Sequence, residues 1–156
     1  MRQGDKATVL LIDDELVNIK ILSDILKGEY EVIFATSGEE GVHRAVESIP
    51  DIILLDVMMP GMDGYAVCSR LQQDARTAGI PVVYVTALGS TAQEVKGLNT
   101  GAIDYITKPI NGEIVKARVR NHLKFRRVVQ TVAMDEPEDE RMAKMTERQR
   151  EIFRWV

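Results

Sequence analysis

The sequence predicts an α/β fold in which a parallel sheet is covered by helices on both faces, and two repeating patterns support this prediction. Short runs of branched apolar residues recur along the chain, as they do in buried strands. These runs are residues 8–12, 31–35, 51–55, 81–85 and 103–106. Segments with helical spacing lie between them, and because parallel strands need crossover connections, the alternation favours a doubly wound parallel sheet.

Each expected helix is recognised by apolar residues three or four positions apart. The first contains Val17, Ile21 and Ile25, the second Val42, Ala45, Val46 and Ile49, the third Val67 and Leu71, and the fourth Val95 and Leu98. The fifth should start near Asn111. In a sheet of this kind, the natural binding site lies at the carboxyl ends of the strands.

The composition fits one globular domain with a short extension, since the 156 residues are 45% hydrophobic and 28% charged. A formal net charge of -4 disfavours coating of nucleic acid by the whole chain. Cys68 is the only cysteine, so no intramolecular disulfide can form, as is usual in a reducing compartment. We expect a soluble, cytoplasmic protein with no membrane association, because the sequence contains neither a signal peptide nor an apolar run of ~18 residues.

Composition divides the chain into three parts. Residues 1–130 carry the alternating strands and helices, including an extended fifth helix. Residues 131–145 include the run MDEPEDE, which cannot contribute to a packed core and is typical of a solvated linker. Helical periodicity restarts over residues 146–156 and leaves an apolar face that needs a partner. We therefore expect the start of a truncated output domain there, or a helix that docks elsewhere.

Polar residues with complementary chemistry follow four of the five expected strands. Asp13 and Asp14 follow the first, Asp56 the third, Thr86 the fourth and Lys108 the fifth. Because carboxyl ends of parallel strands lie along one edge, these side chains should meet there. Three carboxylates would repel one another unless a hard divalent cation such as Mg²⁺ lay between them. Lys108 and Thr86 could then hold the oxygens of a phosphoryl group in transfer, with Asp56 as the nucleophile.

Taken singly, each of these residues has an ordinary structural explanation. An aspartate after a strand is often a helix cap, a threonine that ends a strand can reflect β-propensity, and a lysine before proline is often a solvated loop residue. Their shared edge in the predicted sheet is the observation that favours a common site.

Four motifs, LLIDDE, ILLDVMMPGMDGY, VVYVTAL and GAIDYITKP, are similar to those of the receiver domain of two-component response regulators. The resemblance covers residues 7–128 and implies a flavodoxin-like (βα)5 fold with strand order 2-1-3-4-5. It also implies that Asp56 accepts a phosphoryl group from a phosphohistidine on a sensor histidine kinase. Such a receiver catalyses its own Mg²⁺-dependent phosphoryl transfer and slow autodephosphorylation without being a conventional enzyme.

The resemblance also assigns roles to the other residues of the predicted site. Mg²⁺ would be held by Asp13, Asp14, Asp56 and the backbone carbonyl of Met58. Thr86 and Lys108 would bind the phosphoryl oxygens. A cis peptide bond is implied between Lys108 and Pro109. A degenerate receiver that signals without phosphate is the alternative, but every position that can be matched to the active-site pattern carries the expected residue.

The resemblance further implies how a signal leaves the site. Thr86 would move toward the phosphoryl group, and the ring of Tyr105 would swing from outside to inside as space opens beside the fifth strand. The altered surface would support a phosphorylation-promoted homodimer in which Asp104 and Arg118 could pair across the symmetry axis. The basic side chains of the fifth helix are interpreted as part of this face or as solvated residues, rather than as a nucleic-acid site.

Three kinds of output are compatible with the sequence. The segment MTERQREIFRWV resembles the opening helix of a helix-turn-helix domain, which favours transcription control through DNA binding beyond Val156. The runner-up is a cyclic-dinucleotide enzyme or a hybrid kinase, because KARVRNHLKFRRVVQ is similar to receiver ends that lead into those outputs. The third is a stand-alone phosphorelay receiver, which the acidic linker and the unfinished helix disfavour.

Overall fold

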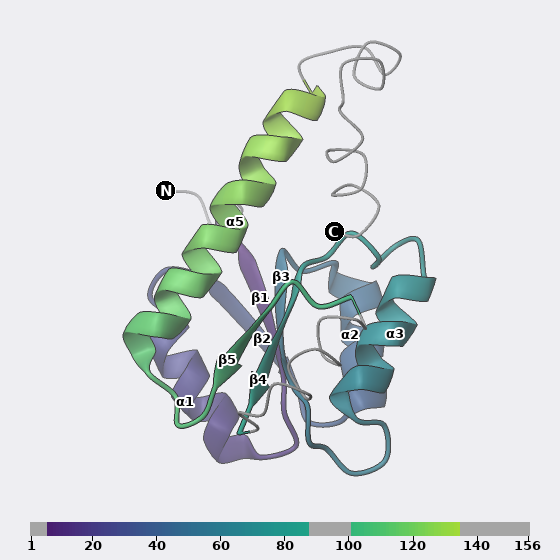
Figure 1. The fold of residues 1–156 in the computed structure, drawn as a ribbon, viewed down its shortest axis with the longest axis vertical. Coiled ribbons are helices and arrows are strands. Elements are labelled where there is room, and N and C mark those ends of the chain that lie inside the picture. Colours follow the sequence, from purple (N-terminus) through teal and green to yellow (C-terminus); the bar gives the residue numbers. More distant parts are fainter. Residues whose placement is uncertain (1–5, 88–100, 135–156) are drawn as a thin grey trace.

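The computed structural model of the protein describes the backbone of residues 6–87 and 101–134, and the side chains of this part as far as Lys124. Its five strands are β1 (Thr8–Ile12), β2 (Glu31–Ala35), β3 (Ile52–Asp56), β4 (Val82–Thr86) and β5 (Asp104–Thr107). All are parallel, and they lie in the order β2-β1-β3-β4-β5 (Figure 1). The predicted fold class and strand order are confirmed.

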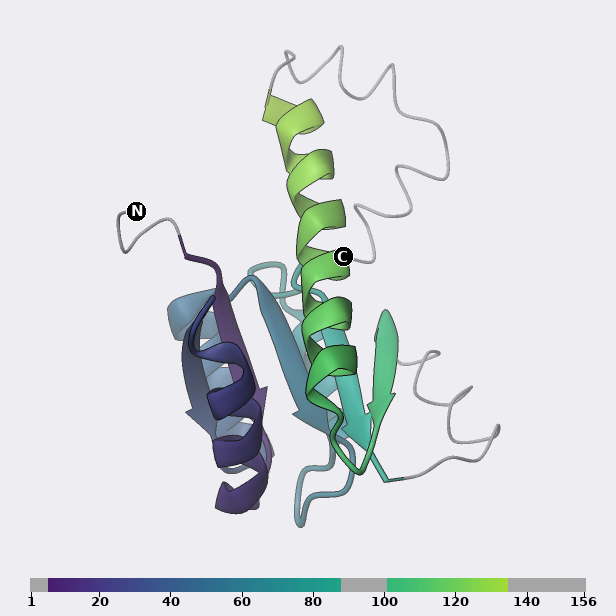
Figure 2. The ribbon, with the colours of Figure 1, turned by 90° about the vertical axis from the view of Figure 1, so that its left-hand side faces the viewer.

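In the described part of the chain, four helices cover the two faces of the sheet. They are α1 (Leu16–Leu26), α2 (Gly38–Ser48), α3 (Gly64–Gln73) and α5 (Gly112–Met134). Figure 2 looks onto the face that is covered by α1 and α5, while α2 and α3 lie on the other face (Figure 1). The expected fourth helix, with Val95 and Leu98, lies outside the described residues.

The core consists of two apolar layers, one on each face of the sheet. Alternate residues of β1 belong to different layers, because successive side chains of a strand point to opposite faces. Leu10 and Ile12 pack with residues of α2 and α3, which include Ala45, Val67 and Leu71. Val9 and Leu11 pack with residues of α1 and α5, which include Ile19, Leu22, Leu26, Val115 and Val119. The central strands are therefore buried on both faces, as in other sheets of this kind.

The residues whose spacing indicated α1 are not the ones that this helix buries most deeply. Val17 is 60% exposed and Ile21 is 42% exposed, whereas Ile19, Leu22 and Leu26 face the sheet. Apolar residues occur around most of this helix, in the sequence LVNIKILSDIL. Their spacing therefore fits two different faces, and the spacing alone does not show which one packs on the sheet.

Element boundaries differ from the prediction by small amounts. Asp56 and Thr86 are the last residues of β3 and β4 rather than the first residues after them. Asn111 precedes α5, and its side-chain Oδ1 accepts hydrogen bonds from the backbone N–H groups of Glu113 and Ile114. This cap explains why the helix begins where the sequence places it.

The C-terminal part of α5 stands beyond the sheet in both ribbon views (Figures 1 and 2). The helix continues to Met134 and so includes the first four residues of the segment expected as a linker. The expected output helix at residues 146–156 lies outside the described residues. Within residues 6–87 and 101–134, no helix is both long enough and apolar enough to cross a membrane.

Candidate functional site

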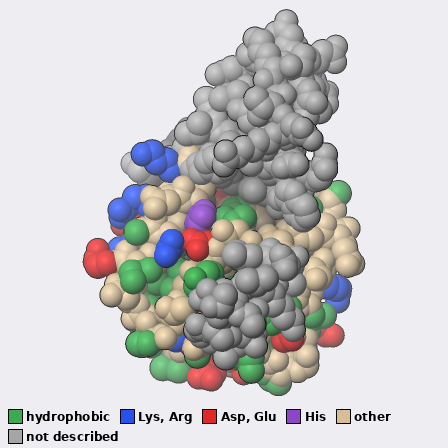
Figure 3. Space-filling model, viewed as in Figure 1, with side chains coloured by type: hydrophobic (Ala, Val, Ile, Leu, Met, Phe, Trp, Pro, Cys, Tyr) green, Lys and Arg blue, Asp and Glu red, His purple; other side chains and the backbone are tan. Residues whose placement is uncertain are grey.

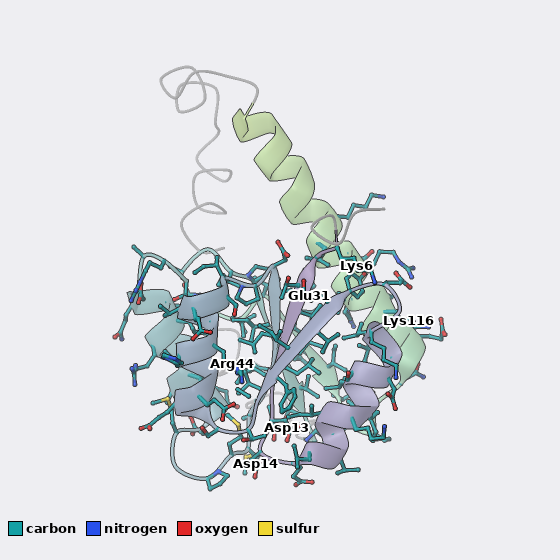
Figure 4. All side chains as sticks on the ribbon, turned by 180° about the vertical axis from the view of Figure 1, so that it is seen from behind. Lys6, Asp13, Asp14, Glu31, Arg44 and Lys116 are labelled. Atoms are coloured by element: carbon teal, nitrogen blue, oxygen red, sulfur yellow. The ribbon has the colours of Figure 1, made fainter. Side chains whose placement is uncertain are left out.

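Three carboxylates meet at the carboxyl ends of two neighbouring strands. Asp13 and Asp14 follow β1, and Asp56 ends β3, which pairs directly with β1. One oxygen from each of the three lies within 4.8 Å of the others. Figure 4 shows Asp13 and Asp14 at one end of the sheet, with Lys6 and Glu31 at the opposite end. The structure thus brings together the residues that the strand ends predict.

The aspartates differ in their burial and hydrogen bonding. Asp13 is only 2% exposed and Asp56 only 4% exposed, whereas Asp14 is half-buried. Asp13 Oδ1 accepts a hydrogen bond of 2.9 Å from the backbone N–H of Glu15. Asp13 Oδ2 is buried, and among the described residues it has no hydrogen-bond donor. A buried carboxylate oxygen without a donor is unfavourable, so the arrangement suits a cation that binds oxygen ligands.

Lys108 provides a positive charge next to two of these carboxylates. Its Nζ lies 3.5 Å from Asp56 Oδ1 and 3.8 Å from Asp13 Oδ2. The backbone N–H of Lys108 donates a hydrogen bond of 2.7 Å to the carbonyl of Thr86, which fixes the start of the loop after β5 against β4. The peptide bond between Lys108 and Pro109 is cis, as the resemblance implies.

Burial raises the pKa of Asp56 to about 6, and the negative charge of Asp13 contributes to the same shift. The ammonium of Lys108 and the backbone N–H of Met58 act in the opposite direction and lower this pKa. The Met58 nitrogen lies 3.4 Å from Asp56 Oδ1. The positive charge therefore compensates only part of the desolvation of the carboxylate. A bound divalent cation would add the missing positive charge and favour the ionised form of Asp56.

The remaining residues of the predicted site lie around this cluster. Thr86 ends β4, the strand beside β3, and is 7% exposed. Met58 follows β3 in the loop toward α3, and its side chain is directed to solvent with an exposure of 64%. Tyr105 lies opposite Tyr84 in the β4–β5 pair and packs, half-buried, against the apolar layer that contains Tyr84.

Asp104 and Arg118 form an ion pair within one chain. Arg118 Nη1 lies 3.3 Å from Asp104 Oδ2, and His122 Nε2 lies 3.0 Å from the same oxygen. Although burial alone would raise the pKa of Asp104, the hydrogen bonds from His122 and the N–H of Tyr105, with the charge of Arg118, lower it. His122 was not among the predicted site residues, but its spacing of four residues from Arg118 places both on one side of α5.

Charged side chains of both signs are interspersed on the face shown in Figure 3. Arg118, Arg120 and Lys124 of α5 are exposed. That these basic side chains form a dimer face or a solvated surface stays a prediction.

Comparison with known proteins identifies the family. Residues 9–120 match the response regulator receiver domain. The response regulator PleD of Caulobacter vibrioides is 43% identical over 137 residues, which are 87% of this chain and 30% of PleD. The DNA-binding dual master transcriptional regulator RpaA of Synechocystis is 44% identical over 113 residues, which are 72% of this chain and 47% of RpaA. This chain thus spans less than half the length of either relative.

Solved structures show the same fold. The chemotaxis protein CheY4 of Vibrio cholerae matches with a TM-score of 0.71 at 27% identity, covering 74% of this chain and 98% of that one. A two-component response regulator from Clostridium difficile matches with a TM-score of 0.71 at 27% identity, covering 76% of this chain and 97% of that one. The chain belongs to the response regulator receiver family, and its cluster of Asp13, Asp14 and Asp56 is typical of the Mg²⁺ site of such domains. A receiver of a two-component system implies a cognate histidine kinase.

Proposed function

We propose that this protein is a phosphorylation-controlled switch in which Asp56 accepts a phosphoryl group from a phosphohistidine on its sensor kinase. The observation that supports this most directly is the group of three carboxylates within 4.8 Å, with the Lys108 ammonium 3.5 Å from Asp56. In this proposal Asp13, Asp14, Asp56 and the backbone carbonyl of Met58 hold Mg²⁺. The cation supplies positive charge that lowers repulsion between the carboxylates and the incoming phosphoryl oxygens.

Asp56 acts as the nucleophile in the proposed reaction. A lone pair of its carboxylate attacks phosphorus while the bond between phosphorus and the histidine nitrogen breaks. The released imidazole keeps the electron pair of that bond and a proton on its other nitrogen. Lys108 places its ammonium against the phosphoryl oxygens, and the Thr86 hydroxyl donates a hydrogen bond to one of them. The product is an acyl phosphate on Asp56.

Dependence on the cation tests this function. The chain is incubated with acetyl phosphate, which supplies a phosphoryl group without a kinase, and its intact mass is measured with Mg²⁺ or with EDTA. We expect one adduct of about 80 Da in Mg²⁺ and none in EDTA, because the uncompensated carboxylates would repel the donor. Equal adduct yields in the two conditions would rule out the proposed cation site.

We further propose that phosphorylation changes the face formed by β5 and α5. Thr86 moves toward the phosphoryl group and Tyr105, now half-buried, turns further inward. The modified face then supports a homodimer. Because Asp104 is already paired with Arg118 and His122 within the chain, dimer formation would exchange these contacts for contacts across the interface.

We propose transcription control through DNA binding as the output, and the similarity to RpaA and the sequence of residues 145–156 support it. The second candidate is a cyclic-dinucleotide enzyme or a hybrid kinase. The similarity to Histidine kinase P4 of Formosa agariphila, 34% identical over 124 residues but only 9% of that protein, is in keeping with the kinase alternative. Sequencing the gene beyond codon 156 distinguishes a helix-turn-helix domain from an enzymatic one.

A further inference from the structure

The first residue of α3 lies unusually close to the backbone of Asp56. Gly64 is buried, and its N–H donates a hydrogen bond of 2.9 Å to the carbonyl of Val57. A Cβ atom at position 64 would lie 2.5 Å from the carbonyl oxygen of Asp56 and 2.7 Å from Cα of Val57. No side chain fits in so small a space, so glycine permits this approach of the helix to the end of β3.

The atoms that crowd Gly64 belong to the backbone of Asp56 and Val57, and this distinguishes it from Gly41. A Cβ at Gly41 would also be close to its neighbours, from 2.5 to 3.0 Å, but the three nearest atoms all belong to the Ile12 side chain. Relief at position 41 therefore begins with a shift of that side chain. Relief at position 64 instead requires α3 or the backbone of Asp56 to move.

The loop between β3 and α3 is held from two sides. Asp63 caps α3, and its Oδ1 accepts a hydrogen bond of 2.9 Å from the N–H of Ala66. On the other side, a Cβ at Gly38, the first residue of α2, would lie 2.7 Å from the carbonyl oxygen of Met62. The backbone of this loop therefore has little freedom to adjust independently of the two helices.

This same loop carries the backbone groups that surround the phosphate acceptor. The N–H of Met58 lies 3.4 Å from Asp56 Oδ1, and its carbonyl is a proposed ligand of the cation. We propose that Gly64 is a positioning residue for phosphoryl transfer, because its missing side chain lets α3 close on the backbone of Asp56 and fix the acceptor carboxylate and Met58. This inference rests on the proposed function of Asp56.

The substitution Gly64→Ala tests the inference in the full 156-residue chain. Intact mass gives the rate of phosphorylation at several concentrations of acetyl phosphate and Mg²⁺, and calorimetry gives the affinity for Mg²⁺. We expect a maximal rate about 10- to 100-fold lower than that of the wild type, since a small displacement of a reacting group has effects of this size. Weaker Mg²⁺ binding should accompany it, because the Asp56 and Met58 ligands move together.

Gly101→Ala is the control, because a Cβ there strains a left-handed backbone with φ 104° and crowds only the Gln72 side chain. Gly101 precedes β5 and so lies at the end of the sheet opposite the carboxylates. Urea unfolding of both variants measures the loss of stability. Gly101→Ala should lose stability but keep the wild-type rate and Mg²⁺ affinity. If the two variants lose similar stability and both retain the wild-type rate and affinity, Gly64 is structural only and the inference is overturned.

A second pair of variants decides the question if Gly64→Ala does not fold. Asp63→Ala removes the cap that holds the start of α3, whereas Asp63→Ser keeps an oxygen acceptor. We expect slower phosphorylation in Asp63→Ala and recovery in Asp63→Ser. Rates in Asp63→Ala and Asp63→Ser that both equal the wild-type rate would overturn the inference.

The proposed function and this inference fail in distinguishable ways. A wild-type chain that gains no phosphoryl group would refute the function of Asp56. The comparison of Mg²⁺ affinities between the wild type and Gly64→Ala would still test positioning, and equal affinities would overturn it.

Discussion

Burial of the ionised Asp56 carboxylate lowers the stability of the metal-free protein. Its pKa in the folded state is raised to about 6 from 3.8 by burial and by the charge of Asp13. The folded state therefore binds the proton more tightly than the unfolded chain does. As the pH rises from about 4 to above 6, the folded state must give up this proton, so the free energy of unfolding decreases.

Asp56→Asn should consequently stabilise the metal-free protein at pH 7.5, because the neutral amide has no charge to desolvate. The expected gain is on the order of 1–3 kcal/mol, and it should largely disappear at pH 4, where the aspartate is already protonated. Urea unfolding in EDTA at the two pH values measures the difference. A gain of the same size at both pH values would contradict this explanation.

The positions of the site residues could be predicted from the sequence because each lies at or just after the carboxyl end of a strand. Asp13, Asp56 and Lys108 lie where the strand ends place them. The contact of His122 with Asp104 could not be predicted in this way, because it depends on how α5 packs on β5. The close contact at Gly64 could not be predicted from the sequence either, because the pattern of residues gives no distance between a helix and a strand end.

At the scale of single elements, α2 ends in an unfavourable backbone conformation. Ile49, its C-cap, has φ 44° and ψ 67°, which is the left-handed region that a β-branched residue rarely adopts. Ile49 is one of the apolar residues whose spacing indicated this helix, but it lies one position beyond the helix end and its side chain is 45% exposed. Glycine is the residue most often found at such a helix end, because it has no Cβ to clash.

Ile49→Gly should therefore raise the free energy of unfolding by about 0.5–1 kcal/mol. This net gain is the strain that glycine relieves in the folded state minus the conformational entropy that glycine adds to the unfolded chain. Ser48→Gly, at the exposed last helical residue, is the control and should lower it by a similar amount. Thermal or urea unfolding compares the variants with the wild type. A loss of stability in Ile49→Gly would show that its left-handed backbone is not a source of strain.

Helix positions were easier to predict than helix faces. The fifth helix was expected to start near Asn111, and the structure confirms that start and shows that the Asn111 side chain caps the helix. The exposed Val17 and Ile21 show the limit of periodicity when apolar residues surround a helix. The face of α1 is decided by its packing against Val9 and Leu11 of the sheet, which is tertiary information.

At the scale of the whole molecule, we expect phosphorylation to promote self-association through the face of Tyr105, Asp104 and Arg118. Unphosphorylated and fully phosphorylated protein should differ in mean mass by light scattering at ~100 μM, a concentration at which even a weak interface is populated. Arg118→Ala should reduce the shift, because it removes a charge from that face. An unchanged monomer mass after full phosphorylation would exclude a dimer switch.

The residue patterns predict only part of the arrangement of the sheet. Alternating strands and helices indicate a doubly wound parallel sheet, but they do not specify which strands are neighbours. The order β2-β1-β3-β4-β5 was expected from the resemblance of LLIDDE and the other motifs to receivers. That order matters for the site, because it places β1, which precedes Asp13 and Asp14, beside β3, which ends in Asp56.

The identity of the phosphorylated residue is the central claim, and mass spectrometry of Asp56→Asn tests it most directly. Wild type, Asp56→Asn and Asp24→Asn, a control at an exposed carboxylate of α1, are each incubated with acetyl phosphate and Mg²⁺. We predict one adduct of about 80 Da on the wild type and on Asp24→Asn, and none on Asp56→Asn. An adduct that persists on Asp56→Asn with the wild-type yield would contradict the assignment of Asp56 as the phosphate acceptor.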